Sequence, residues 1–69
     1  MINVALFGFG RIGQMHAENL SKLKQIKILY IYEKLDRLSK KAKKLYNCQI
    51  VKNSNKIFED KKIDIVFIS

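Results

Sequence analysis

The sequence predicts an α/β fold: a parallel sheet of about four strands, in the order 3-2-1-4, with two main helices on one face. Three observations lead to this prediction. Apolar runs alternate with segments of helical periodicity, every glycine falls between the first apolar run and the first helical segment, and 69 residues suffice for at most one small domain. Strands that alternate with helices pair in parallel through right-handed crossovers, so one sheet is expected.

The first half of the chain supplies two strands and the helix between them. Ile2–Phe7 is apolar without alternation, which is typical of a strand buried on both faces. From Arg11 onward apolar residues recur at helical spacing, and a polar connection at residues 21–25 leads to a second strand at Ile26–Tyr32. The apolar stripe of this first helix is expected to comprise Ile12, Met15, Leu20 and Leu23.

A second helix and a third strand follow. The apolar residues of this helix have a clear 3, 4, 3 spacing with lysines on the outer face, and Asn47 is expected to end it in the left-handed conformation. Gln49–Val51 is expected to form the third strand. The inner stripe of the second helix is predicted to be Leu35, Leu38, Ala42 and Leu45.

The remainder of the chain is predicted to hold a short helix and a final strand. Residues 53–61 can form one or two turns, with a capping Asn or Ser at the start and with Ile57 and Phe58 facing inward. Residues 63–68 are expected to form the last strand. Because so short a connection must cover the second face of the sheet, that face and the edge of the last strand are expected to stay largely exposed.

The glycines form the pattern G-x-G-x-x-G between a strand and a helix, at Gly8, Gly10 and Gly13, and the chain has no other glycine and no proline. In a dinucleotide-binding turn the first glycine permits the tight bend, the second lets the backbone approach a pyrophosphate, and the third allows close packing of helix and sheet. The pattern therefore predicts a cofactor site and a partial Rossmann fold. A turn without a ligand is the alternative, but an ordinary turn needs only one glycine. The backbone amides expected to face the anion are those around Phe9, Arg11 and Ile12.

An acidic residue stands where a dinucleotide site needs one. Glu33 follows the second strand, twenty residues after Gly13, at the place where a carboxylate accepts hydrogen bonds from the adenosine ribose. Its charge would repel a 2′-phosphate, which favours NAD over NADP as the cofactor. Lys34 and Arg37 leave NADP open, because either side chain can neutralise Glu33 or hold a phosphate.

The stretch GFGRIGQMHAENL, the acidic residue after the second strand and the ending KKIDIVFIS together resemble the N-terminal domain of the Gfo/Idh/MocA oxidoreductases, the glucose-fructose oxidoreductase and inositol 2-dehydrogenase-like enzymes. The resemblance includes His16, three residues beyond the third glycine, which we expect to be structural. It implies hydride transfer between nicotinamide and the CH–OH group of a sugar, polyol or related substrate. Gly8, Gly10, Gly13 and Glu33 carry over as cofactor-binding positions.

The same resemblance implies that residues 1–69 are the N-terminal part of a dinucleotide-binding domain and a fragment of a longer enzyme. Ser69 stands where a Thr-Pro loop beside the nicotinamide would begin, and that loop, a later Glu-Lys-Pro segment with the catalytic lysine, and the substrate domain are missing from the sequence. No catalytic residue and no metal ligand is assigned, and the chain alone is expected to be inactive. A C-terminal domain or a second copy of the chain is expected to cover the exposed sheet face.

Two alternatives stay open. GFGRIG also opens the phosphorylating glyceraldehyde-3-phosphate dehydrogenases, although these usually have Asn where this chain has Phe7 and Arg where it has Gln14. The other alternative is a non-catalytic basic interaction module or a remnant, because fourteen Lys and Arg against six Asp and Glu give a formal charge of +8. The lysines are spread along the chain with no pattern of interleaved aromatic residues, so nucleic acid is not an expected partner.

Cysteine usage and hydropathy bear on the compartment. Cys48 is the only cysteine, which fits a reducing cytoplasm and a thiol buried as a small apolar group. No apolar run approaches the 18 or so residues that a membrane span needs, and the N-terminus has no secretory signal. We expect a cytoplasmic protein with no membrane partner.

Overall fold

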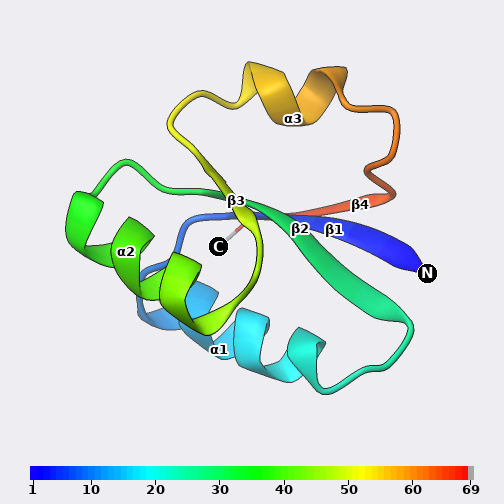
Figure 1. Ribbon diagram of the computed structural model, residues 1–69, viewed down its shortest axis with the longest axis horizontal. Helices are drawn as coiled ribbons and strands as arrows, with labels where there is room; N and C mark the ends of the chain where they lie inside the picture. Colours follow the sequence, from blue (N-terminus) through cyan, green and yellow to red (C-terminus); the bar gives the residue numbers. More distant parts are fainter. Residues whose placement is uncertain (69) are drawn as a thin grey trace.

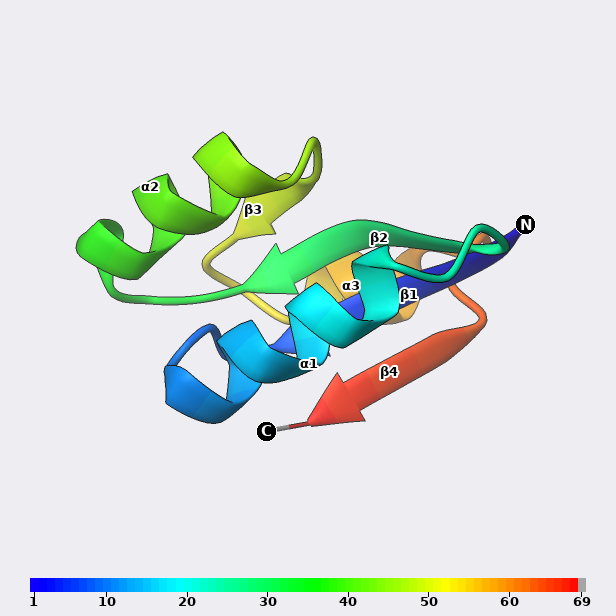
Figure 2. The same cartoon turned by 90° about the horizontal axis from the view of Figure 1, so that it is seen from below.

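Strand β1 (Ile2–Phe7) lies inside a parallel four-stranded sheet with the order β3-β2-β1-β4, as predicted (Figure 1). The computed structural model describes residues 1–68. All strand pairings are parallel, so the carboxyl ends of the strands meet at one edge, and Figure 2 shows the arrowheads of β2, β3 and β4 pointing toward it. The other elements, in chain order, are α1 (Arg11–Ser21), β2 (Ile26–Tyr32), α2 (Asp36–Leu45), β3 (Gln49–Val51), α3 (Asn55–Glu59) and β4 (Ile65–Ile68).

Helices α1 and α2 cover one face of the sheet and α3 covers the other, which confirms the predicted placement of the two main helices (Figure 1). The second face is better covered than the sequence predicted. Ala5, Tyr30 and Val51 are buried beneath Ile57 of α3, and the Tyr30 hydroxyl donates a hydrogen bond to Asp60 just after this helix. A short helix suffices here because a single isoleucine, 1% exposed, fills the centre of this face.

Helix α1 meets the sheet through small residues. Gly13 and Ala17 are its buried positions, and Leu20 packs against the same core. The predicted stripe is therefore wrong in phase, since Ile12 and Met15 are 51% and 50% exposed. Glycine and alanine let a helix backbone lie close to the strands, whereas larger apolar residues would hold the helix away. The side of α1 that carries the small residues therefore faces the sheet.

Helix α2 buries only the middle of its predicted stripe. Leu38 and Ala42 are buried, whereas Leu35 and Leu45, at the two ends of the stripe, are each 58% exposed. The helix ends without a left-handed residue, because Tyr46 is extended and no described residue other than glycine has a positive φ. The expected role of Asn47 was thus wrong.

The segment around α3 corrects two further details. Ser54 is the N-cap and makes no capping bond through its side chain, whereas the side-chain oxygen of Asn53, one residue earlier, accepts a hydrogen bond from the Asn55 amide at 2.8 Å. Phe58 is 68% exposed rather than facing inward. Strand β4 begins at Ile65 rather than at residue 63, because the Ile63 amide donates to the Asp60 carbonyl in a turn. The edge of β4 is exposed as predicted, at Ile65 and, more strongly, at Ile68.

The glycine turn yields a test of fold stability. Gly8 has a φ of 97°, which an L side chain adopts at a cost of about 1–2 kcal/mol, so Gly8→Ala should lower the free energy of unfolding by about that amount. Urea denaturation followed by circular dichroism measures the change. Gly10→Ala is the matched control, because Gly10 has a φ of −71° and should tolerate alanine. Equal stabilities of the two variants would contradict the strain at Gly8.

Candidate functional site

The loop between β1 and α1 lies at the carboxyl edge of the sheet (Figure 2). The strand order reverses at β1, because β2 and β3 lie on one side of it and β4 on the other. Gly8 turns the chain off β1, and its amide donates a hydrogen bond of 2.8 Å to the Tyr32 carbonyl at the end of β2. Helix α1 then starts at Arg11 with Gly10 as its N-cap. Ligands of open α/β sheets bind in the crevice at such a reversal of strand order.

Phe9 anchors this loop in the core. Its side chain is fully buried, and its ring packs edge-on against Tyr46 with 6.1 Å between the ring centroids. The Phe9 carbonyl accepts a hydrogen bond of 3.1 Å from the Gln14 side chain, one turn into the helix. The middle residue of the glycine turn is thus fixed by packing as well as by hydrogen bonding.

Gly10 is different, because nothing inside the described protein requires a glycine there. Its φ of −71° and ψ of −164° suit any residue, and no described heavy atom beyond Gly10 and its two chain neighbours lies within 4 Å of the position that a Cβ would take. No side chain caps α1, and the first amides of a helix have no partner within it. The surface above Gly10 is therefore an open space beside the positive end of α1.

Glu33 joins the two loops at this edge. One carboxylate oxygen accepts the Phe9 amide at 2.7 Å and the other accepts the Leu35 amide at 3.0 Å. Partial burial acts to raise the pKa of Glu33, but hydrogen bonds from the Leu35, Phe9 and Lys34 amides and the charge of Lys52 outweigh it and leave this pKa below its ordinary value. Glu33 is therefore held as a charged acceptor.

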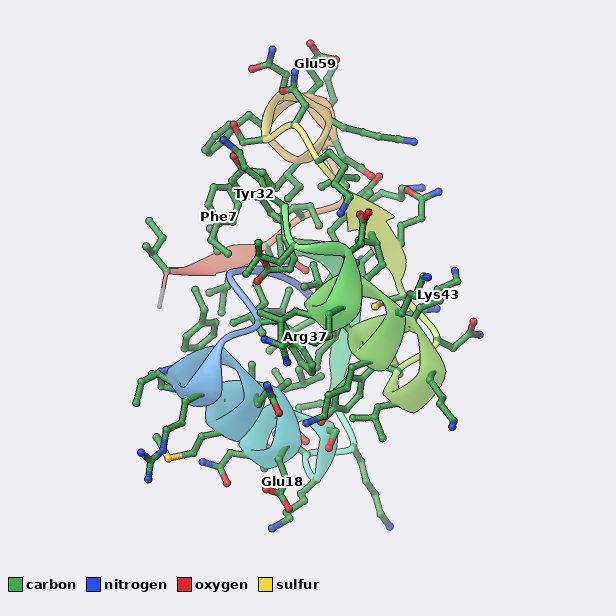
Figure 3. The ribbon with its side chains drawn as sticks, turned by 90° about the vertical axis from the view of Figure 1, so that its left-hand side faces the viewer. Phe7, Glu18, Tyr32, Arg37, Lys43 and Glu59 are labelled. Atoms are coloured by element: carbon green, nitrogen blue, oxygen red, sulfur yellow. The ribbon has the colours of Figure 1, made fainter. Side chains whose placement is uncertain are left out.

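A hollow of about 310 Å³ opens beside these groups. Its walls come from the ends of β1, β2 and β4 and from the loop after β2. Phe7 and Tyr32 lie together (Figure 3), with 5.1 Å between their ring centroids, and form the apolar side of the hollow. The lining residues are Phe7, Gly8, Tyr32, Glu33, Lys34 and Ile68.

A larger hollow, of about 470 Å³, lies beside α2 and β3 and is lined by lysines. Two of these lysines form hydrogen bonds within the protein: Lys43 donates to the Cys48 carbonyl, and Lys52 donates to three oxygens near the start of α2. We take the smaller hollow as the candidate site, because it lies where the glycine turn and the acidic residue meet.

The structure brings most of the predicted site residues together. Gly8, Phe9, Gly10 and Glu33 lie in one hydrogen-bonded unit with the start of α1, where the side chains of Arg11 and Ile12 are exposed. Gly13 lies beneath them as a buried packing position. One detail differs from expectation: the Phe9 amide donates to Glu33 and is not directed at an anion.

The side chains of His16 and Cys48 both pack against neighbouring residues. The half-buried imidazole of His16 stacks at a tilt near Phe67 of β4, with 6.0 Å between the ring centroids. Cys48 is buried, and burial raises the pKa of its thiol. Ser69 lies outside the described residues.

Sequence reasoning missed the residues that support Glu33 from behind. Its amide donates to the Val51 carbonyl at 3.2 Å, and its carbonyl accepts the Ser39 hydroxyl at 3.1 Å. A serine three residues before Ala42, on the inner side of α2, was the available signal for Ser39. No sequence signal distinguished Lys52, because the chain has lysines throughout.

The described residues include neither a cluster of metal ligands nor a membrane-spanning helix. No group of three or more His, Cys, Asp or Glu side chains is placed to hold a metal ion. No helix in residues 1–68 has both the length and the apolar character needed to cross a bilayer.

The strand order, the glycine turn after β1 and the acidic residue after β2 define a Rossmann-type fold. The family model described as "Oxidoreductase family, NAD-binding Rossmann fold" (GFO_IDH_MocA) matches residues 2–69. The chain therefore belongs to the Gfo/Idh/MocA oxidoreductase family, the first of the two families that its opening residues resemble. The matched domain is an NAD-binding one, in agreement with the predicted cofactor.

Solved structures of this fold are close in shape. Myo-inositol dehydrogenase from Corynebacterium glutamicum is 25% identical with a TM-score of 0.88, and the match covers 100% of this chain and 21% of that one. Scyllo-inositol dehydrogenase from Lactobacillus casei, with bound NAD(H) and scyllo-inositol, is 26% identical with a TM-score of 0.86, covering 99% and 21%. A putative myo-inositol dehydrogenase from Sinorhizobium meliloti has 23% identity and a TM-score of 0.91, covering 100% and 21%.

The chain thus spans about a fifth of the length of these dehydrogenases. No curated protein sequence is similar enough to this chain to count as a match.

The hydrogen bonds to Glu33 predict a pH dependence of stability. A carboxylate whose pKa is lower in the folded chain stabilises the fold above its unfolded pKa, about 4.3 for glutamate, and this contribution is lost as the pH falls through the folded pKa. The unchanged chain should therefore exceed Glu33→Gln in unfolding free energy at pH 7, and the difference should shrink toward pH 3. Urea denaturation at several pH values measures both chains. A difference that stays constant with pH would show that the carboxylate charge contributes nothing.

Proposed function

We propose that this chain is the nucleotide-binding part of an NAD-dependent oxidoreductase that acts on the CH–OH group of a sugar, polyol or related substrate. The fold and family carry the coarse part of this proposal, and the open surface at Gly10 is the single observation that carries the site. The inositol dehydrogenases of similar fold support the substrate class.

The pyrophosphate of the cofactor is assigned to the start of α1. An alanine at position 10 would fit the ligand-free protein, so the glycine there is explained by the close approach of a ligand to the backbone. The uncapped amides of the first turn, at Arg11 and Ile12, supply hydrogen-bond donors, and the positive end of the helix favours an anion. Gly8 shapes the bend, and Gly13 lets the helix lie close to the sheet.

The adenosine ribose is assigned to Glu33. Its two oxygens offer about four lone-pair sites, and the bonds from the Phe9, Leu35 and Lys34 amides leave at least one of these sites for the ribose hydroxyls. A held negative charge at this point disfavours a 2′-phosphate, which supports NAD over NADP. Lys34 and Arg37 are exposed on the same loop and first turn, and Figure 3 shows Arg37 at the start of α2, so some NADP binding is compatible with the site.

Bound NAD would supply the hydride acceptor of the reaction. In this proposal the residues of this chain bind and orient the cofactor, while the groups that bind substrate and move its proton belong to a further domain. Residues 1–69 are then the N-terminal part of a dinucleotide-binding domain, and without that further domain they bind NAD but do not turn over a polyol.

Gly10→Ala tests the pyrophosphate assignment. The Cβ should weaken NAD binding by at least about tenfold while leaving the unfolding free energy unchanged, because the position is open in the protein itself. Isothermal titration calorimetry with NAD gives the dissociation constant, and urea denaturation gives the stability. Unchanged affinity in the variant would remove Gly10 from the site.

Glu33→Ala tests the ribose assignment. Loss of hydrogen bonds to a charged acceptor, about 1.5–3 kcal/mol, should weaken NAD binding by roughly ten- to a hundredfold and narrow the preference for NAD over NADP. Glu18→Ala is the matched control, because Glu18 is exposed on α1 and lies well away from the hollow (Figure 3). Equal NAD affinity of the Glu33 and Glu18 variants would refute the assignment.

A further inference from the structure

The first residue after β3 reaches across to the loop that carries Glu33. The Lys52 ammonium donates three hydrogen bonds: to the Lys34 carbonyl at 3.2 Å, to an Asp36 carboxylate oxygen at 3.0 Å and to the Ser39 hydroxyl at 2.9 Å. These acceptors belong to the loop after β2 and to the first turn of α2. An ammonium has three protons, so this set uses all of them.

The third of these bonds leads directly to Glu33. The Ser39 hydroxyl accepts from Lys52 and donates to the Glu33 carbonyl at 3.1 Å, so a chain of two hydrogen bonds connects the lysine to the main chain of the acidic residue. Ser39, the middle member of this chain, is buried at 8% exposure. The Glu33 amide donates to the Val51 carbonyl at the end of β3, so β3 and α2 together hold the two main-chain polar groups of Glu33.

Lys52 also acts on the position of the Glu33 carboxylate. The Leu35 amide that donates to this carboxylate follows Lys34, whose carbonyl Lys52 holds. The positive charge lies near enough to help keep the carboxylate ionised, together with the backbone amides. The ion pair with Asp36 alone would contribute little, because its two side chains are 49% and 86% exposed.

We propose that Lys52 is a positioning residue for cofactor binding: it fixes the loop of residues 33–36 so that the Glu33 carboxylate meets the ribose hydroxyls in a preset geometry. Lys52 itself lines the neighbouring lysine-rich hollow and does not line the candidate cofactor hollow, so it acts through the loop. The inference rests on the proposed function, because it assumes that Glu33 binds the ribose.

Lys52→Met keeps the length of the side chain and removes its three donors. In the full 69-residue chain it should weaken NAD binding by about tenfold and speed hydrogen exchange locally, at the Phe9 and Leu35 amides that donate to Glu33. Exchange at the central amides of β1 should stay as in the unchanged chain, which separates a local release of the loop from a general loss of stability. Calorimetry with NAD and amide exchange by NMR provide the two readouts.

Two further variants complete the experiment. Lys56→Met is the matched control, because Lys56 lines the same lysine-rich hollow and should change neither readout. Ser39→Ala removes the two hydrogen bonds of the Ser39 hydroxyl while leaving the lysine in place, and should weaken NAD binding as Lys52→Met does. It also serves as the second variant if Lys52→Met does not fold.

The outcomes separate the two proposals. If the unchanged chain binds NAD and neither Lys52→Met nor Ser39→Ala weakens that binding, the role of Lys52 is overturned and the proposed function is not. Weakening accompanied by equally faster exchange throughout β1 would also overturn it, because general destabilisation then accounts for the loss. A chain that binds no NAD even without substitution would overturn the proposed function itself.

Discussion

The hydrogen bond between the Phe9 amide and the Glu33 carboxylate is the interaction on which the site depends. It joins the turn after β1 to the loop after β2 at 2.7 Å, and so holds the phosphate side and the ribose side of the proposed cofactor site in one frame. The Phe9 ring is fully buried and packs against Tyr46, the residue that follows α2. Glu33 is held on its other side by Leu35 and from behind by β3. The site is thus rigid at both ends before any ligand arrives, which limits the ordering cost of binding.

The three glycines are present for three different reasons. Gly8 is required by a positive φ, Gly13 by close packing of α1 on the sheet, and Gly10 by neither of these. A turn that served only the fold would need the first two. In the proposed function the third glycine serves a ligand that approaches the backbone, as expected of the family to which the chain belongs.

The limits of prediction followed from the size of the side chains. Strand boundaries were accurate for β1, β2 and β3, because these mostly apolar runs end at Gly8, Glu33 and Lys52. The buried side of α1 was missed because the periodicity was judged from large residues, while the contact is made by Gly13 and Ala17. The second sheet face was better covered than expected because Ile57 lies over its centre.

By itself, the sequence determined the glycine turn and the acidic residue after the second strand, since each is a local pattern whose spacing alone carries the information. The alternation of strands and helices determined the strand order, through the rules for parallel crossovers. Only the tertiary structure decided that the Phe9 amide donates to Glu33, that Ser39 and Lys52 support Glu33, and which side of α1 faces the sheet. These contacts join residues 24, 6 and 13–18 positions apart through side chains of common types. No spacing rule identifies such partners, because they are brought together by the packing of α2 and β3 around the loop.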